Sequence, residues 1–120
     1  MLDVLRPSPR ALLVHLPTSA LLRPIVDAVR ADPSDQRTLT GWATVLGCSE
    51  RTLTRAFRTE TGTSFTRWVA SVRAQHAVRL LARGFEVEVV ADAVGYRSAS
   101  AFGAAFRRTT GTTPGRFRAP

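Results

Sequence analysis

Arginine gives this sequence its most distinctive chemistry. All 17 basic residues are Arg, nine residues are acidic, and the formal net charge is +8. A guanidinium group is planar and permanently charged, and its fork of N–H donors matches the geometry of phosphate groups and of guanine edges. Residues 38–120 hold twelve of the arginines against five acids, whereas residues 1–37 hold five against four. This charge predicts a polyanionic partner, nucleic acid before membrane, with a basic solvated surface as the alternative.

Residues 50–61 place polar and basic side chains at helical spacing. The apolar residues Leu53, Ala56 and Phe57 form the expected inward stripe of a helix, so the side chains between them point elsewhere. The expected outward face consists of Glu50, Arg51, Thr54, Arg55 and Arg58. Its side chains can donate several hydrogen bonds to a partner; the alternative is a solvated face.

Residues 99–110 follow the same spacing with a much poorer surface. The expected inward stripe consists of Ala101, Phe102, Ala105 and Phe106. The expected outward face consists of Ala99, Ser100, Gly103 and Ala104. Of these four, only Ser100 carries a hydrogen-bonding side chain, although an alanine methyl could meet a thymine methyl.

Both segments belong to a unit that occurs twice. Residues 39–65 and 87–114 coincide at a shift of 48 up to an internal glycine and 49 beyond it. The paired residues are Leu39 with Val87, Trp42 with Val90, Ala43 with Ala91, Leu46 with Val94, Gly47 with Gly95, Ser49 with Ser98, Leu53 with Phe102, Phe57 with Phe106, Arg58 with Arg107 and Gly62 with Gly111. Each copy reads as a short helix, a Gly turn, a capping Ser and a second helix that ends at Gly. This pattern predicts two helix-turn-helix units.

An uninterrupted helical pattern joins the two units and is expected to fix their separation. It covers residues 66–83, with Trp68, Val69, Val72 and Leu80 near one stripe, and Gly84 ends it.

The chain before the first unit divides into an arm and a helix. Residues 1–21 are interrupted by prolines and read as an N-terminal arm or the linker remnant of an upstream sensor region, in which Ser8 and Pro9 could start a short helix through Leu16. Pro24 suits the first turn of a helix that stops at the turn over residues 32–35. We therefore expect one all-α domain over residues 22–118.

A run of spaced residues in the second unit carries a family resemblance. The run is Ala91, Gly95, Tyr96, Ser98, Phe102, Phe106, Arg107, Gly111, Thr113, Pro114, Phe117 and Arg118. It resembles the signature of the AraC/XylS family of bacterial transcription regulators, in their C-terminal DNA-binding domain, and the resemblance covers roughly residues 22–118. It implies about seven helices, with two helix-turn-helix subdomains joined by a long central helix. It also implies recognition helices over residues 50–61 and 99–110.

The resemblance assigns roles to individual side chains. It implies sequence-specific binding of double-stranded DNA, with base contacts from Arg51, Thr54, Arg55 and Ser100. Phosphate contacts are expected from Ser49, Arg58, Arg97, Ser98, Arg107 and Arg108. Because the second outward face lacks long polar side chains, we expect the first unit to read bases and the second to act chiefly as a phosphate clamp.

Other chemistry finds little support. His15 and His76 have no partners at ligand spacing, and Glu86 and Glu88 diverge on a helix, so we expect no metal, no cofactor and no catalytic site. The aromatic residues, which could serve as stacking platforms, are expected to pack in the core. They are Trp42, Phe65, Trp68, Phe85 and Tyr96. Cys48 is expected to be a small core residue.

These observations rank three classes of function. The first is a transcription regulator. We expect it in the cytoplasm, since the single Cys excludes an internal disulfide and no segment reads as a membrane span or a signal peptide. RNA polymerase is a further candidate partner, and a small-molecule effector is expected only if the intact protein has an upstream sensor domain. The alternatives are an RNA-binding or general nucleoid protein, and a hydrolase or transferase.

Overall fold

A computed structural model describes residues 14–120, and over this range the chain is all-α, as expected. The elements are α1 (Arg23–Ala31), α2 (Leu39–Leu46), α3 (Glu50–Thr61), α4 (Phe65–Ala82), α5 (Val87–Ala93), α6 (Ala99–Thr110) and the 3-10 helix η3 (Pro114–Phe117). Both predicted recognition helices, α3 and α6, have the expected bounds. The short helix expected from Ser8 begins outside the described residues, and residues 14–18 are not helical.

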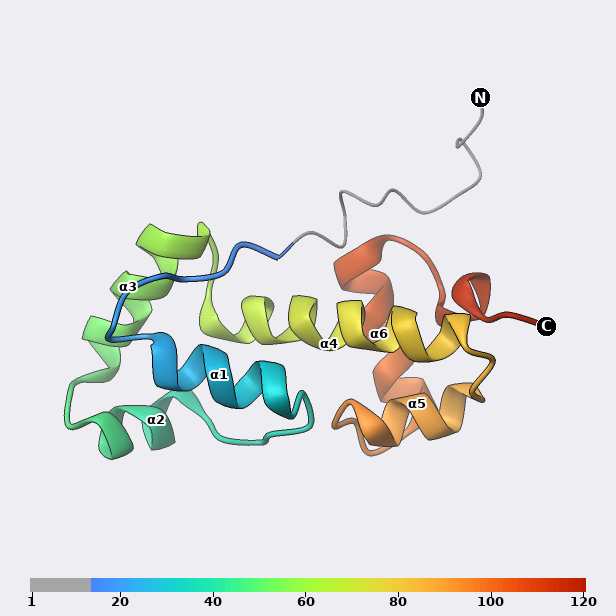
Figure 1. Cartoon of the computed structure of the whole chain (residues 1–120), viewed down its shortest axis with the longest axis horizontal. Helices are drawn as coiled ribbons and strands as arrows, with labels where there is room; N and C mark the ends of the chain where they lie inside the picture. Colours follow the sequence, from blue (N-terminus) through green and yellow to red (C-terminus); the bar gives the residue numbers. More distant parts are fainter. Residues whose placement is uncertain (1–13) are drawn as a thin grey trace, which may run out of the picture.

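The long helix α4 separates two subdomains. Its 18 residues make it about 27 Å long at 1.5 Å per residue. In Figure 1, α1, α2 and α3 gather around its N-terminal half, and α5, α6 and η3 lie around its C-terminal half. We call these the first and second subdomains. Both recognition helices run steeply across the axis of α4 (Figure 1).

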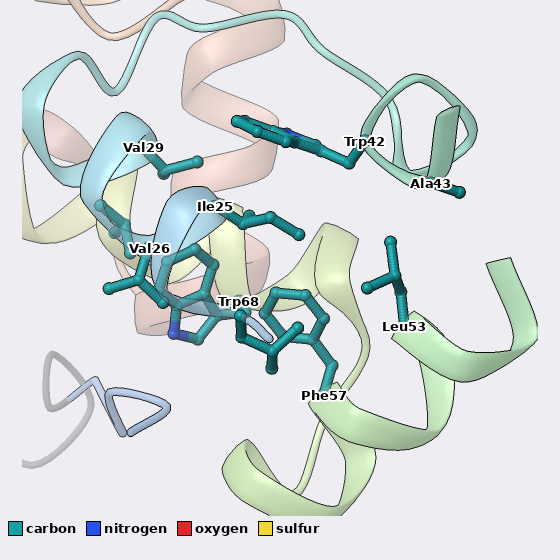
Figure 2. Close-up of a cluster of buried hydrophobic side chains, with 10 residues drawn as sticks. Ile25, Val26, Val29, Trp42, Ala43, Leu53, Phe57 and Trp68 are labelled. Carbon is teal, nitrogen blue, oxygen red and sulfur yellow. The ribbon is translucent and has the colours of Figure 1, made fainter. Parts of the chain in front are cut away.

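Each subdomain has its own hydrophobic core, and α4 contributes to both. In the first core, Trp68 and Val72 pack with side chains of α1, α2 and α3, as Figure 2 shows for Trp68 and Phe57. The second core takes Ala74, Ala77 and Leu81 from α4.

The expected single stripe on α4 is therefore wrong. At 100° per residue, the stripe of residues 68 and 72 lies on nearly the opposite side of the helix from that of residues 74, 77 and 81. Leu80 is only partly buried, whereas Leu81 is completely buried. The helix turns one face to the first core and another to the second.

The two helix-turn-helix units repeat their local hydrogen bonds. The hydroxyl of Ser49 accepts from the N–H of Thr52 at 3.1 Å, and that of Ser98 accepts from the N–H of Ala101 at 3.0 Å. Near the other end of each helix, Thr61 donates to the Phe57 carbonyl at 2.7 Å, and Thr110 donates to the Phe106 carbonyl at 2.9 Å. The side chains that cap and close each recognition helix are thus equivalent.

The segment before α1 is fastened to the first subdomain. The Glu60 carboxylate accepts hydrogen bonds from the backbone N–H groups of Thr18 and Ser19, both at 3.1 Å. The indole N–H of Trp68 donates to the His15 carbonyl at 3.1 Å. These contacts connect the arm with the last turn of α3 and the first turns of α4.

The turn glycines Gly47 and Gly95 occupy equivalent positions but different surroundings. Both have left-handed backbone, with φ of 69° and 93°. A Cβ on Gly47 would meet nothing within 4 Å. A Cβ on Gly95 would lie 2.8 Å from the Cα of Ser34 and 2.8 Å from Nε2 of Gln36, because the loop between α1 and α2 approaches this turn.

We expect Gly95→Ala to destabilise the fold more than Gly47→Ala. Each substitution places an L side chain in left-handed backbone, at a cost of about 1–2 kcal/mol. Gly95→Ala also forces the Ser34 backbone aside, which should add about 1–3 kcal/mol. Urea unfolding of both variants measures the difference in free energy of unfolding. Equal decreases in the two variants would show that the loop moves aside without destabilising the fold.

Candidate nucleic-acid interface

The outward face of α3 is exposed as its spacing predicts. Leu53 and Phe57 are completely buried and Ala56 is half-buried, which orients the helix. The exposed residues are Glu50, Arg51, Thr54, Arg55 and Arg58. The three arginines share this face with one carboxylate, so the surface has excess positive charge.

The inward stripe of α6 differs from the expected one at one residue. Phe102, Ala105 and Phe106 are buried, but Ala101 is exposed, as is its counterpart Thr52 in the first subdomain. Residue 101 lies about 100° from residue 102 around the helix, outside a stripe that continues instead to the buried Thr110.

The outward face of α6 retains its poor set of donors. Ser100 and Ala104 are exposed, and Ala99 and Gly103 are half-buried. Ser100 remains the only hydrogen-bonding side chain among these four residues. The two recognition helices therefore share a scaffold but present chemically different surfaces.

Thr54 of α3 and Arg108 of α6 line the same groove, which has a volume of about 410 Å³. Its lining from α4 consists of Phe65, Thr66, Val69, Ala70 and Arg73. Each recognition helix thus places part of its exposed surface at one common groove.

The arginines divide into those with structural partners and those without. Arg118 pairs with Glu86 at 2.6 Å, and Arg37 lies 3.6 Å from Asp35 with its guanidinium over the Trp42 ring. Within residues 14–120, several exposed arginines have no acidic partner within ion-pair distance. These are Arg51, Arg55, Arg58, Arg67, Arg97, Arg107 and Arg108. Their charge is available to an external anion.

Arg67 is a candidate that the sequence reasoning did not include. It is exposed in the first turn of α4 and lines a second groove together with Arg108. This groove also contains Thr66, Ser71 and Thr109. No sequence signal marked Arg67, because the helical pattern alone did not show which side of α4 faces α6.

The aromatic residues and Cys48 are explained by packing, with one exception. Trp42 and Trp68 are buried, and Cys48 packs against the first core, as expected. Phe85 is not a core residue: it is 41% exposed, and the guanidinium of Arg83 lies 5.4 Å from its ring centroid. It follows Gly84, where the chain leaves α4, so it lies outside the second core.

Glu86 is occupied by its ion pair with Arg118. Within residues 14–120, no three His, Cys, Asp or Glu side chains lie together in a way that could hold a metal ion. Among the helices of this range, none is both long and apolar enough to cross a bilayer.

Comparisons with curated proteins find transcription regulators. The chain is 41% identical over 102 residues to the HTH-type transcriptional regulator RipA of Corynebacterium glutamicum, covering 85% of this chain and 31% of RipA. It is 36% identical over 106 residues to the HTH-type transcriptional regulator NimR of Escherichia coli, covering 87% of this chain and 39% of NimR. The chain thus spans about a third of the length of the curated relatives that it matches.

Solved structures give the same fold. The DNA-binding domain of the global transcriptional factor AdpA, in complex with a target DNA, superposes with a TM-score of 0.75 at 32% identity, covering 83% of this chain and 91% of that one. The C-terminal domain of AraT, a response regulator from Geobacillus stearothermophilus, has a TM-score of 0.76 at 27% identity, with coverages of 83% and 84%.

A family model also covers most of the chain. The model, described as a helix-turn-helix domain, matches residues 42–120. This range includes both recognition helices and the connector between them. The chain belongs to the AraC/XylS family of bacterial transcription regulators, as its double helix-turn-helix DNA-binding domain.

Proposed function

We propose that this domain recognises one specific duplex site by placing α3 and α6 in two successive major-groove segments. The observation that carries the proposal is that both recognition helices open onto one groove, on a rigid connector, with unpaired arginines around them. The connector is about 27 Å long, comparable with the roughly 34 Å of one DNA turn. The AdpA domain, which has the same fold, is solved in complex with a target DNA, and this supports DNA as the partner.

The proposed contacts divide between bases and phosphates. Arg51, Thr54 and Arg55 of α3 read base edges, since they are exposed near the start of the helix where a groove-inserted helix makes its contacts. On α6 only Ser100 takes this role. Phosphates are bound by Ser49, Arg58, Arg97, Ser98, Arg107 and Arg108.

The two serines have a second role. Ser49 and Ser98 already cap the recognition helices through their hydroxyl oxygens. Each hydroxyl can also donate to a phosphate at the helix N-terminus, where the backbone amides favour an anion.

The chain is part of a non-enzymatic regulator that acts in the cytoplasm. RNA polymerase is the proposed protein partner. A small-molecule effector belongs to the proposal only if the intact protein has an upstream sensor domain. An RNA-binding or nucleoid protein shares the basic charge but does not need two recognition helices on one rigid connector.

Selection from random duplexes should recover one preferred site, and footprinting on it should show two protected major-groove segments about one helical turn apart, roughly 34 Å. The monomeric domain should suffice, because one chain holds both recognition helices. Protection of a single segment, or equal affinity for bulk DNA, would contradict the proposal.

Arg55→Ala should weaken binding to the preferred site by about 1–3 kcal/mol and relax the preference at one or two base pairs, because a bidentate Arg–guanine contact discriminates by that amount. Ser100→Ala, at the poorer face, should change the preference only slightly. Affinities for every single-base variant of the site test this difference. If base changes in the half-site under α6 lower the affinity as much as changes under α3, the two helices contribute equally to specificity.

Replacing Arg58, Arg107 or Arg108 by Ala should weaken binding to all duplexes about equally. Each lost phosphate contact should flatten the slope of log affinity against log salt by roughly one unit. Arg79→Ala is the matched control, because Arg79 is exposed in a separate groove on the other side of α4. A slope that stays the same in the three variants would mean that these arginines face solvent.

A further inference from the structure

The loop between α1 and α2 of the first subdomain is held by Arg73 of the connector α4. The Nε of Arg73 donates to the Pro33 carbonyl at 2.7 Å, and its Nη2 donates to the Asp35 carbonyl at 2.9 Å. The same guanidinium lies 5.2 Å from the ring centroid of Tyr96, in the turn of the second subdomain. One side chain thus contacts a loop of the first subdomain and an aromatic ring of the second.

Gln36 connects the two subdomains directly. Its Nε2 donates to the Gly95 carbonyl at 2.8 Å and to the Ser34 carbonyl at 2.9 Å. The approach is so close that a Cβ on Gly95 would lie 3.2 Å from Cζ of Arg73 as well as against the loop. We call this set, Gln36 and Arg73 with Gly95 and Tyr96, the loop-to-turn bridge.

The loop itself is ordered by local hydrogen bonds. Ser34 donates to the Asp32 carboxylate from its hydroxyl at 2.5 Å and from its backbone N–H at 3.0 Å. Both hydrogen bonds lower the pKa of Asp32. The bridge therefore attaches to a loop that is held by its own hydrogen bonds.

Away from the bridge, the two subdomains are connected through α4. Their cores are separate, and they contact α4 through nearly opposite stripes. The groove of about 410 Å³ separates Thr54 from Ala105 and Arg108, and the bridge lines one part of it. The bridge adds a second connection between the subdomains beside α4, and it is placed to restrain their rotation relative to each other.

We propose that the loop-to-turn bridge sets the angle and spacing between α3 and α6, which makes Arg73 and Gln36 positioning residues that select the spacing of the two half-sites. This inference rests on the proposed function. Two linked binding elements gain affinity only when their geometry allows both to engage, so a rigid bridge restricts the accepted spacing and a loose one widens it.

The test measures affinity on the selected duplex and on versions with one base pair inserted or deleted between the half-sites. The wild-type domain should lose roughly 10- to 100-fold on the altered spacings, because the second half-site is rotated and shifted. Arg73→Ala should bind the original duplex more weakly but lose only a few-fold on the altered ones. Gln36→Ala, which removes an exposed side chain, should also show a smaller loss of affinity on the altered spacings than the wild type. Arg79→Ala should match the wild type.

A measurement without DNA tests the bridge independently. NMR alignment tensors of the two subdomains should coincide in the wild type and in Arg79→Ala, and diverge in Arg73→Ala and Gln36→Ala. If Arg73→Ala fails to fold, Gln36→Ala still tests whether the bridge fixes the orientation of the subdomains. A wild type that binds no duplex selectively would refute the proposed function, while the tensors still report on the bridge. Coincident tensors and a full spacing penalty in both bridge variants would overturn the inference.

Discussion

The rest of the structure depends on one constraint, which is that α4 must bury side chains in two different cores. Trp68 and Val72 pack in the first core, and Ala77 and Leu81 pack on nearly the opposite side in the second. Since a helix has a fixed rotation per residue, the number of residues between these stripes sets how one subdomain is turned relative to the other. The orientation of both recognition helices follows from this rotation and from the bridge beside it.

The two subdomains show how a duplicated scaffold can support unequal surfaces. Caps, turn glycines and threonine hydrogen bonds recur at equivalent positions, because the backbone groups at helix ends need the same partners in both copies. The outward faces are free of that requirement. One carries Arg51 and Arg55 and the other carries Ser100 and Ala104, all of them exposed, so the same scaffold presents two different surfaces.

Several sequence expectations needed correction, and the reasons are tertiary. Ala101 is apolar and one position from the buried stripe, yet it is exposed because nothing packs over it. Phe85 is exposed because the chain turns away from the second core at Gly84. Apolar character predicts burial only where a neighbouring element covers the residue, and for an isolated residue beside a turn the periodic pattern cannot show this.

The sequence by itself determined the all-α class, the bounds of both recognition helices, the duplicated unit and the composition of each outward face. These depend on contacts within a few residues: a Ser accepting from an amide three positions on, a glycine in left-handed backbone, an apolar stripe at helical spacing. Only the tertiary structure decided that Thr54 and Arg108 border one groove, that Arg67 and Arg108 line another, and that Gln36 reaches Gly95 across 59 residues of chain. Those contacts depend on how α4 turns one subdomain against the other, and a rotation between distant segments leaves no local pattern in the sequence.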